Sequence, residues 1–207
     1  MLHAILWQEN ADIVHACRHH PFVRGLFAGT LAIEAFRRYV GQDAFFLRAF
    51  VQAYAVALAR CESLAHVRQL YSFVGGALEE LKLHAAYAAD LGIELDEVSP
   101  WPSTLAYTDF LRRTAWHTDL GPTLAAMTPC MRLYAYLGQA GAAQRRGAHP
   151  FARWIDTYSS REFDLLARQV ETLLDALAAD TPAVHDAYRY SLQCELQFFS
   201  APLEPGA

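Results

Sequence analysis

The spacing of apolar residues along the chain is the feature that most limits its fold. Large apolar side chains recur at steps of three and four residues, which is the repeat of one face of an α-helix. The clearest run is Phe36, Tyr39, Val40, Leu47 and Phe50. No stretch shows the alternating, β-branched pattern bounded by turn residues that is typical of strands. The pattern therefore predicts an all-α fold.

Glycine and proline divide this helical pattern into segments. They gather at 25–29, 92–102, 121–122 and 147–150, where we expect the chain to turn. The predicted helices are residues 2–18, 31–60, 63–91, 103–117, 122–145, 150–179 and 181–199. The 207 residues contain no internal repeat and no long linker, so one domain fits the whole chain. We expect a single bundle of about seven helices over residues 1–207, with a frayed tail from about residue 200.

The charge and the cysteines of the chain indicate which binding partners and which cellular compartment to expect. The net charge is −5 and Lys and Arg form no block, so we expect no nucleic-acid partner and no polybasic membrane patch. The longest apolar stretch, 49–59, is far shorter than the ~20 residues of a membrane span. Four cysteines without CxxC spacing favour reduced thiols over a disulfide scaffold. Glu9 and Asp12 interrupt the early apolar residues, which argues against a signal peptide. We therefore expect a cytoplasmic protein.

Two predicted helices carry a carboxylate where the helical repeat calls for an apolar residue. Asp43 lies on the stripe that begins at Phe36, and Glu195 interrupts an aromatic face between Tyr188 and Phe199. Burying an unpaired carboxylate is expensive, and a carboxyl in an apolar pocket has a raised pKa that suits proton transfer near neutral pH. Each of the two could equally be a structural carboxylate that is paired within the core.

Cys130 is the third unusual residue, and it shares a helix face with Met127 and Tyr134. A lone cysteine is usually a small buried apolar residue. Here Pro129 removes a backbone hydrogen bond beside it, and Tyr134 places a ring one turn away. A thiol, two buried carboxylates and aromatic rings suit a flat, polar heterocycle. The thiolate would act as the nucleophile and a carboxylate would move protons. These features do not identify the substrate.

A series of short segments resembles the TenA (thiaminase II) family. The segments are His20-Pro21-Phe22-Val23, Gly29-Thr30-Leu31, Tyr39-Val40-Gly41-Gln42-Asp43, Phe45-Phe46-Leu47, Thr128-Pro129-Cys130 with Tyr134, Trp154-Ile155-Asp156-Thr157-Tyr158 and Glu195-Leu196-Gln197-Phe198. Each is modest alone, but together they run in order from His20 to Phe199, over nearly the whole chain. Related haem-oxygenase-like families do not share the cysteine and the Thr-Tyr pair together.

The resemblance implies a haem-oxygenase-like helical bundle without haem, which is usually a homotetramer. Members of the family hydrolyse 4-amino-5-aminomethyl-2-methylpyrimidine to the hydroxymethyl compound in thiamin salvage, and many also cleave thiamin. This implies a small-molecule pyrimidine substrate and no cofactor or metal. By resemblance Cys130 adds to C6 of the ring, and Glu195 protonates the ring nitrogen and assists expulsion of the leaving group. Asp43 would hold the amidine edge and help to activate the thiol.

The resemblance also assigns five aromatic side chains to the substrate: Phe46, Tyr107, Tyr134, Tyr158 and Phe198. Phe46, Tyr134 and Phe198 would form the walls. Tyr107, in Thr104-Leu105-Ala106-Tyr107-Thr108, matches a family tyrosine near Asp43, and Tyr158 would hydrogen-bond near the thiol. Phe46 departs from the family, because relatives often have tyrosine there. The change is neutral if only the ring face matters, and it alters leaving-group preference if the hydroxyl is used.

Three alternatives remain at this point. Glu79, Glu80 and His84 could contribute to a metal-dependent oxidase on the same bundle, but di-iron bundles use a Glu-xx-His step from two helices and no second copy occurs. The simpler interpretation of Glu80 and His84 is a surface pair one turn apart. A haem protein would need a proximal histidine such as His15 or His19. A non-catalytic pyrimidine binder or regulator is disfavoured by the thiol and the glutamate.

Overall fold

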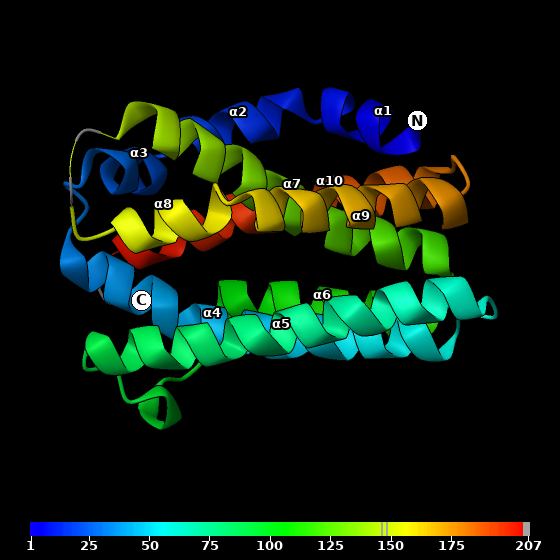
Figure 1. The fold of residues 1–207 in the computed structure, drawn as a ribbon, viewed down its shortest axis with the longest axis horizontal. Helices are drawn as coiled ribbons and strands as arrows, with labels where there is room; N and C mark the ends of the chain where they lie inside the picture. The colour runs from blue at the N-terminus through cyan, green and yellow to red at the C-terminus, as the bar shows by residue number, and fades with distance from the viewer. Residues whose placement is uncertain (146, 148, 205–207) are drawn as a thin grey trace.

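The computed structural model describes residues 1–145, 147 and 149–204, and every regular element within them is helical (Figure 1). The described part contains ten α-helices: α1 (Leu2–Glu9), α2 (Ala11–His19), α3 (Pro21–Ala28), α4 (Ile33–Ala59), α5 (Leu64–Asp90), α6 (Pro102–His117), α7 (Leu120–Gln144), α8 (Ala152–Tyr158), α9 (Arg161–Leu177) and α10 (Pro182–Ser200). Two short 3-10 helices, η1 (Leu95–Glu97) and η2 (Ala201–Leu203), complete it. The predicted all-α class is confirmed, and the predicted count of about seven helices is wrong.

The additional helices arise where local side chains bond to the backbone. The side-chain amide of Asn10 donates to the Leu6 carbonyl at 2.8 Å and divides the predicted first helix into α1 and α2. The Ser160 hydroxyl accepts from the Phe163 N–H at 3.1 Å, which begins α9 as a separate helix after α8. The third addition, α3, occupies a predicted turn. It starts at Pro21, a residue that suits the first helical position, and ends at Gly29 with φ of 72°.

The helices form two groups that face each other across the core. In Figure 1 the long helices α4, α5 and α6 lie in the lower half, and α7, α8, α9 and α10 lie in the upper half, with α1 and α2 along its outer side. Helix α4 packs on both α5 and α6, while α7 packs on α8, α9 and α10. The inner faces of α4, α5, α7 and α10 therefore surround one interior.

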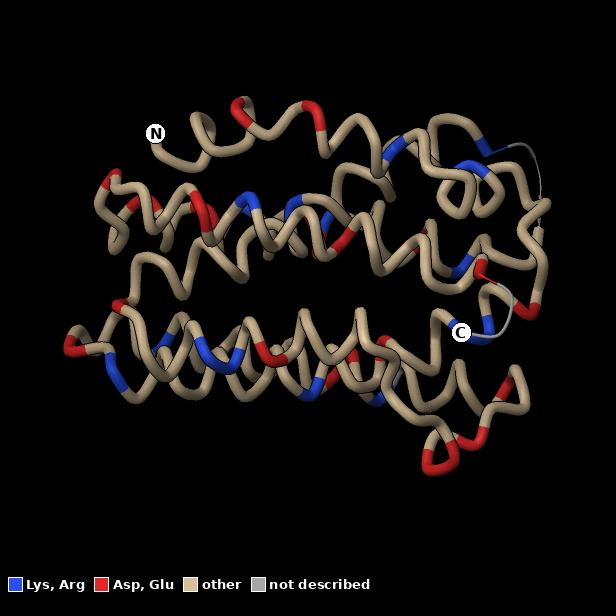
Figure 2. Tube along the Cα trace, turned by 180° about the vertical axis from the view of Figure 1, so that it is seen from behind, with Lys and Arg blue, Asp and Glu red and all other residues tan. Residues whose placement is uncertain are grey.

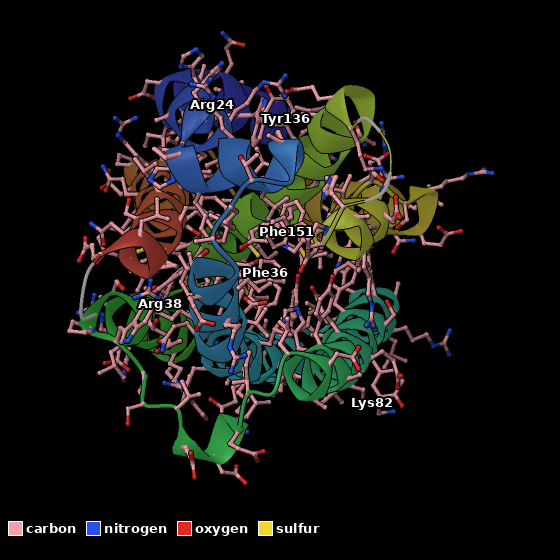
Figure 3. All side chains as sticks on the ribbon, turned by 90° about the vertical axis from the view of Figure 1, so that its left-hand side faces the viewer. Arg24, Phe36, Arg38, Lys82, Tyr136 and Phe151 are labelled. Atoms are coloured by element: carbon pink, nitrogen blue, oxygen red, sulfur yellow. The ribbon has the colours of Figure 1, made fainter. Side chains whose placement is uncertain are left out.

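Aromatic side chains fill one end of this interior. The end view in Figure 3 places the labelled rings of Phe36 and Phe151 in the middle of the molecule, and Arg24 and Lys82 at its outside. The two ring centroids are 4.8 Å apart. Tilted ring pairs at this distance stabilise a core beyond their buried area. The pair joins α4 to the residue that precedes α8.

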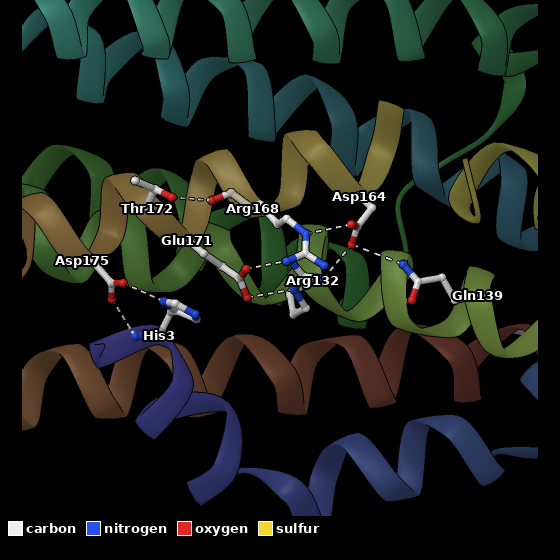
Figure 4. Close-up of polar contacts among 8 residues, drawn as sticks. All are labelled: His3, Arg132, Gln139, Asp164, Arg168, Glu171, Thr172 and Asp175. Atoms are coloured by element: carbon white, nitrogen blue, oxygen red, sulfur yellow. Dashed lines mark hydrogen bonds and ion pairs between the residues drawn. The ribbon is translucent and has the colours of Figure 1, made fainter. Parts of the chain in front are cut away.

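An ion-pair network fixes α7 against α9 (Figure 4). The guanidinium of Arg132 donates to both carboxylate oxygens of Glu171, at 2.8 and 2.6 Å, and to Asp164 at 3.1 Å. Such bidentate, charge-assisted bonds are directional and strong, especially when they are partly buried. Since Arg132 lies two residues after Cys130, the network also limits rotation of the helix segment that carries the thiol.

The chain end and the surface complete the fold. A frayed tail was expected from about residue 200, but residues 201–203 form η2, where Ala201 and Pro202 are buried. The last three residues of that predicted tail lie outside the described part. Lys and Arg are interspersed with Asp and Glu along the helices (Figure 2). None of the described helices is long and apolar enough to cross a membrane.

Candidate active site

The thiol of Cys130 faces an interior cavity between the two helix groups. The cavity is small, about 10 Å³, and is lined by Asp43, Phe46, Leu47, Phe50, Glu80, Cys130, Met131, Tyr134, Tyr158 and Phe163. Cys130 is buried, and burial raises the pKa of its thiol well above the usual value, with the negative charge of Glu195 as the next cause. Without a ligand, the side chain is therefore a neutral thiol at neutral pH.

Glu195 on α10 is buried and contacts Tyr107 on α6. The Tyr107 hydroxyl donates to its carboxylate at 2.7 Å and also contacts the Ser191 hydroxyl at 2.9 Å. Burial raises the pKa of Glu195 to about 8, with the Asp43 charge adding to the rise and the hydrogen bond from Tyr107 opposing it. The charge of Glu195 in turn contributes to the raised pKa of the Cys130 thiol. The carboxyl thus holds a proton at neutral pH beside the sulfur.

Asp43 forms an ion pair that the sequence analysis missed. Its carboxylate lies 3.0 Å from Nε2 of His84 on α5, and both side chains are buried. Burial opposes a positive charge on His84. The attraction and hydrogen bond of Asp43, together with the charge of Glu80, outweigh that effect and raise the pKa of His84 above its usual value. This ion pair therefore holds the Asp43 side chain in place.

Glu80 and Tyr158 form a second polar contact in the same wall. The Tyr158 hydroxyl donates to the Glu80 carboxylate at 2.9 Å. Burial raises the pKa of Glu80, and the nearby His84 lowers it in part. The interpretation of Glu80 and His84 as a surface pair is wrong, since His84 is only 8% exposed and Glu80 lines the cavity. Tyr158 lines the same cavity as Cys130, and its hydroxyl bonds to this glutamate.

The aromatic side chains surround these polar groups. The ring of Phe46 lies 4.8 Å from Tyr107 and 6.1 Å from Phe198, measured between centroids. The rings of Tyr134 and Tyr158 are 4.8 Å apart, and the Tyr134 hydroxyl accepts a hydrogen bond from Tyr39 at 3.0 Å. Flat, apolar walls of this kind suit a planar ring.

The eight predicted site residues divide into two sets in the structure. Five of them line the cavity directly: Asp43, Phe46, Cys130, Tyr134 and Tyr158. The other three lie behind this wall: Tyr107, Glu195 and Phe198. The Tyr107 hydroxyl binds Glu195 and Ser191, and its ring lies against Phe46, one turn from Asp43 on α4.

The comparison with family models shows which family the chain belongs to. The model of the TENA/THI-4/PQQC family matches residues 7–203. The chain belongs to this family. The resemblance to TenA proteins that the short segments indicated is thereby confirmed. A solved TenA family transcription regulator from Silicibacter sp. TM1040 superposes with a TM-score of 0.92 and 30% identity over 98% of this chain and 96% of that one.

Relatives of this TenA-family chain include aminopyrimidine aminohydrolases and a thiamine biosynthesis multifunctional protein, ThiED of Corynebacterium efficiens. The aminopyrimidine aminohydrolase of Halalkalibacterium halodurans is 32% identical over 83% of this chain and 80% of its own length. The mitochondrial bifunctional TH2 protein of Arabidopsis thaliana is 33% identical over 88% of this chain and 34% of its own length. The chain spans about a third or less of the long multifunctional relatives that it matches.

The metal-oxidase alternative depends on clustered ligands. In the part of the chain that the structure describes, no three His, Cys, Asp or Glu side chains form a group that could hold a metal ion. Asp43 and His84 pair with each other, and Glu80 accepts from a tyrosine. These residues thus have protein partners in the TenA-family site.

Proposed function

We propose that this chain is an aminopyrimidine aminohydrolase of the TenA family that uses Cys130 to hydrolyse 4-amino-5-aminomethyl-2-methylpyrimidine. The observation that carries the proposal is the pair of buried groups Cys130 and Glu195, in which burial raises the pKa of the carboxyl to about 8. A protonated carboxyl at this point can give one proton and take another. The curated aminopyrimidine aminohydrolases among the relatives, at about 30% identity, support the same reaction class.

The first step adds the thiol across the ring bond between C6 and its neighbouring nitrogen. The sulfur forms a bond to C6, and the electron pair of the C6–N bond moves to the nitrogen. Glu195 delivers its proton to that nitrogen from one oxygen and accepts the thiol proton at the other. Because Glu195 relays the proton, no free thiolate needs to form in a site that raises the pKa of Cys130.

The second step replaces the amine by water. The substituent on the C5 methylene is a protonated amine. The lone pair of the 4-amino group moves toward C5 and expels this substituent, so that neutral ammonia leaves with the electron pair of the C–N bond. Water then adds to the exocyclic methylene carbon and gives up one proton to the solvent, and the electron pair returns to the 4-amino nitrogen. Finally the ring nitrogen returns its proton to one oxygen of Glu195, the C6–N double bond forms again, and the sulfur leaves with the C–S electron pair and takes the proton that Glu195 holds on its other oxygen. The product is the hydroxymethyl pyrimidine.

Asp43 has a binding role in this proposal. An amidine edge, with its amino group and ring nitrogen, matches a carboxylate in hydrogen-bond geometry. The His84 partner keeps Asp43 oriented toward the cavity and compensates its charge. Phe46 and Tyr134 would lie against the faces of the ring.

The direct test is an assay of the purified protein. It is incubated after chelation, with the aminomethyl pyrimidine and separately with thiamin, and ammonia and the hydroxymethyl pyrimidine are quantified. Release of both products in equal amounts without added metal supports the proposal. Binding without turnover would make the chain a pyrimidine-binding protein, and turnover restored only by iron or manganese would favour a metal enzyme.

A further inference from the structure

A buried serine on α10 differs from the other hydroxyl side chains of the helices. Ser191 is fully buried and lies one turn before Glu195. Hydroxyls within helices commonly bond to the backbone carbonyl four residues earlier, as those of Thr128 and Ser200 do here. In the described part of the chain, the Ser191 hydroxyl instead has a single hydrogen-bond partner, the Tyr107 hydroxyl on α6 at 2.9 Å. Ser191 is thus directed at a side chain that also contacts Glu195.

The bond from Tyr107 to Glu195 fixes the direction of the bond to Ser191. A phenol has one proton, and Tyr107 donates it to Oε1 of Glu195 at 2.7 Å. At its contact with Ser191, the Tyr107 oxygen can then only accept, so the serine hydroxyl donates. The three side chains form a chain of hydrogen bonds that leaves α10 at Ser191 and returns to it at Glu195.

This chain is an important influence on the proton of Glu195. The side chain is 1% exposed, and among the described residues no Lys, Arg or His nitrogen lies within the 4.0 Å of an ion pair from its carboxylate. Burial raises the pKa of Glu195, and the hydrogen bond from Tyr107 is the main effect that opposes the rise. A donor that itself receives a hydrogen bond is polarised and donates more strongly. Ser191 therefore strengthens the bond that favours the ionised carboxylate.

We propose that Ser191 is a positioning residue that acts through Tyr107. It donates to the Tyr107 hydroxyl, holds the proton of that hydroxyl on Oε1 of Glu195, and so helps the carboxyl to release its own proton from the other oxygen. The effect on catalysis rests on the proposed function, in which Glu195 gives a proton to the ring nitrogen. The hydrogen-bonded chain itself does not depend on that function. Without the serine hydroxyl, Glu195 becomes a weaker acid.

The other titratable groups that act on Glu195 remain the same in a comparison of Ser191 variants. Burial raises the pKa of the three thiols and the two phenols among them, which keeps these groups neutral near pH 8. The remaining group is a carboxylate that keeps its ion-pair partner, His84, in every variant. The groups are Cys17 on α2, Tyr39 and Asp43 on α4, Cys130 and Tyr134 on α7, and Cys194 on α10.

The test follows the proton of Glu195 without any substrate. Infrared difference spectra titrate the C=O band of the protonated carboxyl. The band is assigned by its absence from Glu195→Gln, because burial raises the pKa of Glu80 as well. In the wild type the band should disappear with a midpoint at about pH 8. We expect Ser191→Ala to move this midpoint upward by roughly 0.2–0.7 pH units, a fraction of a hydrogen bond to a charged group.

Two further variants separate hydrogen bonding from packing. Ser191→Cys fills the same space with a much weaker donor, and it should move the midpoint in the same direction as alanine. Tyr107→Phe should raise the midpoint by itself, because it removes the bond to Glu195. Adding Ser191→Ala to Tyr107→Phe should then raise the midpoint no further, since the serine acts only through the tyrosine hydroxyl. Circular dichroism confirms that each variant is folded.

Ser200→Ala is the matched control. It removes a hydroxyl from the same helix, but this hydroxyl bonds to His20 and to the Leu196 carbonyl. The control should keep the wild-type midpoint and the wild-type rate of ammonia release. Ser191→Ala should also lower kcat, by roughly two- to fivefold, because a weaker acid protonates the ring nitrogen more slowly.

Three results would overturn the proposal. An unchanged or lowered midpoint in folded Ser191→Ala would mean that the serine does not strengthen the bond to Glu195. Equal shifts with and without the Tyr107 hydroxyl would mean that Ser191 acts through packing, and a shift in Ser200→Ala would show a general response of α10. The expected shifts, combined with no ammonia release by the wild-type protein, would support the role of Ser191 and remove hydrolysis from the proposed function.

Discussion

At the residue scale, the chemistry depends on where the proton of Cys130 goes. A thiol is a weak nucleophile while it keeps its proton, and burial makes Cys130 hold it more tightly. The charge of Glu195 would add to this effect, but its own raised pKa leaves it protonated at neutral pH. The two groups therefore suit a concerted transfer, in which attack and proton movement occur together. The proposed reaction needs both groups, and replacing each of them should change the hydrolysis rate in a different way.

Replacing Cys130 with serine should remove turnover and keep binding. An alkoxide is much harder to form than a thiolate, so we expect the hydrolysis rate of Cys130→Ser to fall by orders of magnitude while pyrimidine affinity changes little. Ammonia release and calorimetric titration on one preparation measure the two quantities. Cys61→Ser, at a half-buried cysteine outside the cavity lining, is the control and should keep wild-type turnover. A Cys130→Ser protein that retains most of its activity would exclude the cysteine as nucleophile.

Replacing Glu195 with glutamine should abolish proton transfer and change the response to pH. Glutamine keeps the shape of the side chain but cannot exchange a proton, so the rate should fall by roughly 10²–10⁴-fold while affinity changes much less. In the wild type, Glu195 must be protonated to donate, so kcat/KM should decline as pH rises through about 8. This decline should be absent from the residual activity of the variant. Equal losses of rate and affinity would make Glu195 a binding residue only.

The same glutamate gives a stability prediction with a definite sign. A folded-state carboxyl whose pKa is raised from 4.5 to about 8 binds its proton more tightly than the unfolded chain does. The contribution of Glu195 to the free energy of unfolding therefore falls progressively as pH rises from about 4.5 to about 8. Above about pH 8 it falls no further. We expect the melting temperature of Glu195→Gln to fall less than that of the wild type between pH 5 and pH 8. Parallel curves would mean that Glu195 is not a buried acid.

Single residues also show what the sequence could and could not predict about the site. Asp43, Cys130 and Glu195 were found because each interrupts an apolar helix face, and the structure buries all three. His84 interrupts the buried face of α5 in the same way, between Ala77 and Ala88. It was missed because the Glu-xxx-His step is also typical of a surface pair. Its partner Asp43 lies on another helix, and a pairing between helices is not visible in local spacing.

At the scale of elements, the contact between α7 and α8 positions Tyr158. Gly138 on α7 faces the end of α8, and a Cβ atom there would lie 2.3 Å from the carbonyl carbon of Tyr158 and 2.5 Å from its oxygen. These are backbone atoms that cannot move aside by changing rotamer. The close approach thus requires glycine. It also sets the distance from the Tyr158 hydroxyl to Glu80 on α5.

Gly138→Ala should therefore damage both stability and the site. Overpacking typically costs about 1–3 kcal/mol, and we expect a loss of this size in the free energy of unfolding together with a lower hydrolysis rate. Urea titration and ammonia release measure the two effects. Gly75→Ala on α5 is the control, since a Cβ there meets nothing within 4 Å and alanine favours the helix by about 0.5–1 kcal/mol. A neutral result for Gly138→Ala would mean that α8 adjusts its position freely.

Element boundaries illustrate a different limit of the sequence. The long helices α4, α5 and α7 match their predicted segments closely because their apolar repeats are long. The breaks at Asn10 and Ser160 were missed because each depends on one side chain that bonds to the backbone. Such residues also occur within continuous helices, so the packing of α1 on α9 and of α8 on α7 has to select the break.

At the scale of the whole molecule, the outer face of α5 carries an apolar stripe. Leu64, Tyr71 and Leu78 are 73%, 71% and 45% exposed, and they follow one another at seven-residue intervals. This is the interval at which one helix meets another along a seam. The inner face of the same helix carries Glu80 and His84. A second copy of the chain on this stripe would therefore support the element that holds the site.

We expect the chain to form a homo-oligomer, a tetramer by its TenA resemblance, with this stripe in one of its interfaces. Tyr71→Glu places a carboxylate in the middle of the stripe, where burial against another copy would leave it unpaired. Size-exclusion chromatography with light scattering should then show a smaller species than the wild type at the same concentration. Gln69→Glu, a neighbouring change of similar charge on α5, is the control and should keep the wild-type mass.

A wild-type monomer would contradict the oligomer itself, and an unchanged mass for Tyr71→Glu would place the interface on another face. Because every residue proposed to act on the substrate comes from one chain, the smaller species should still release ammonia, at a rate set by how firmly α5 is held.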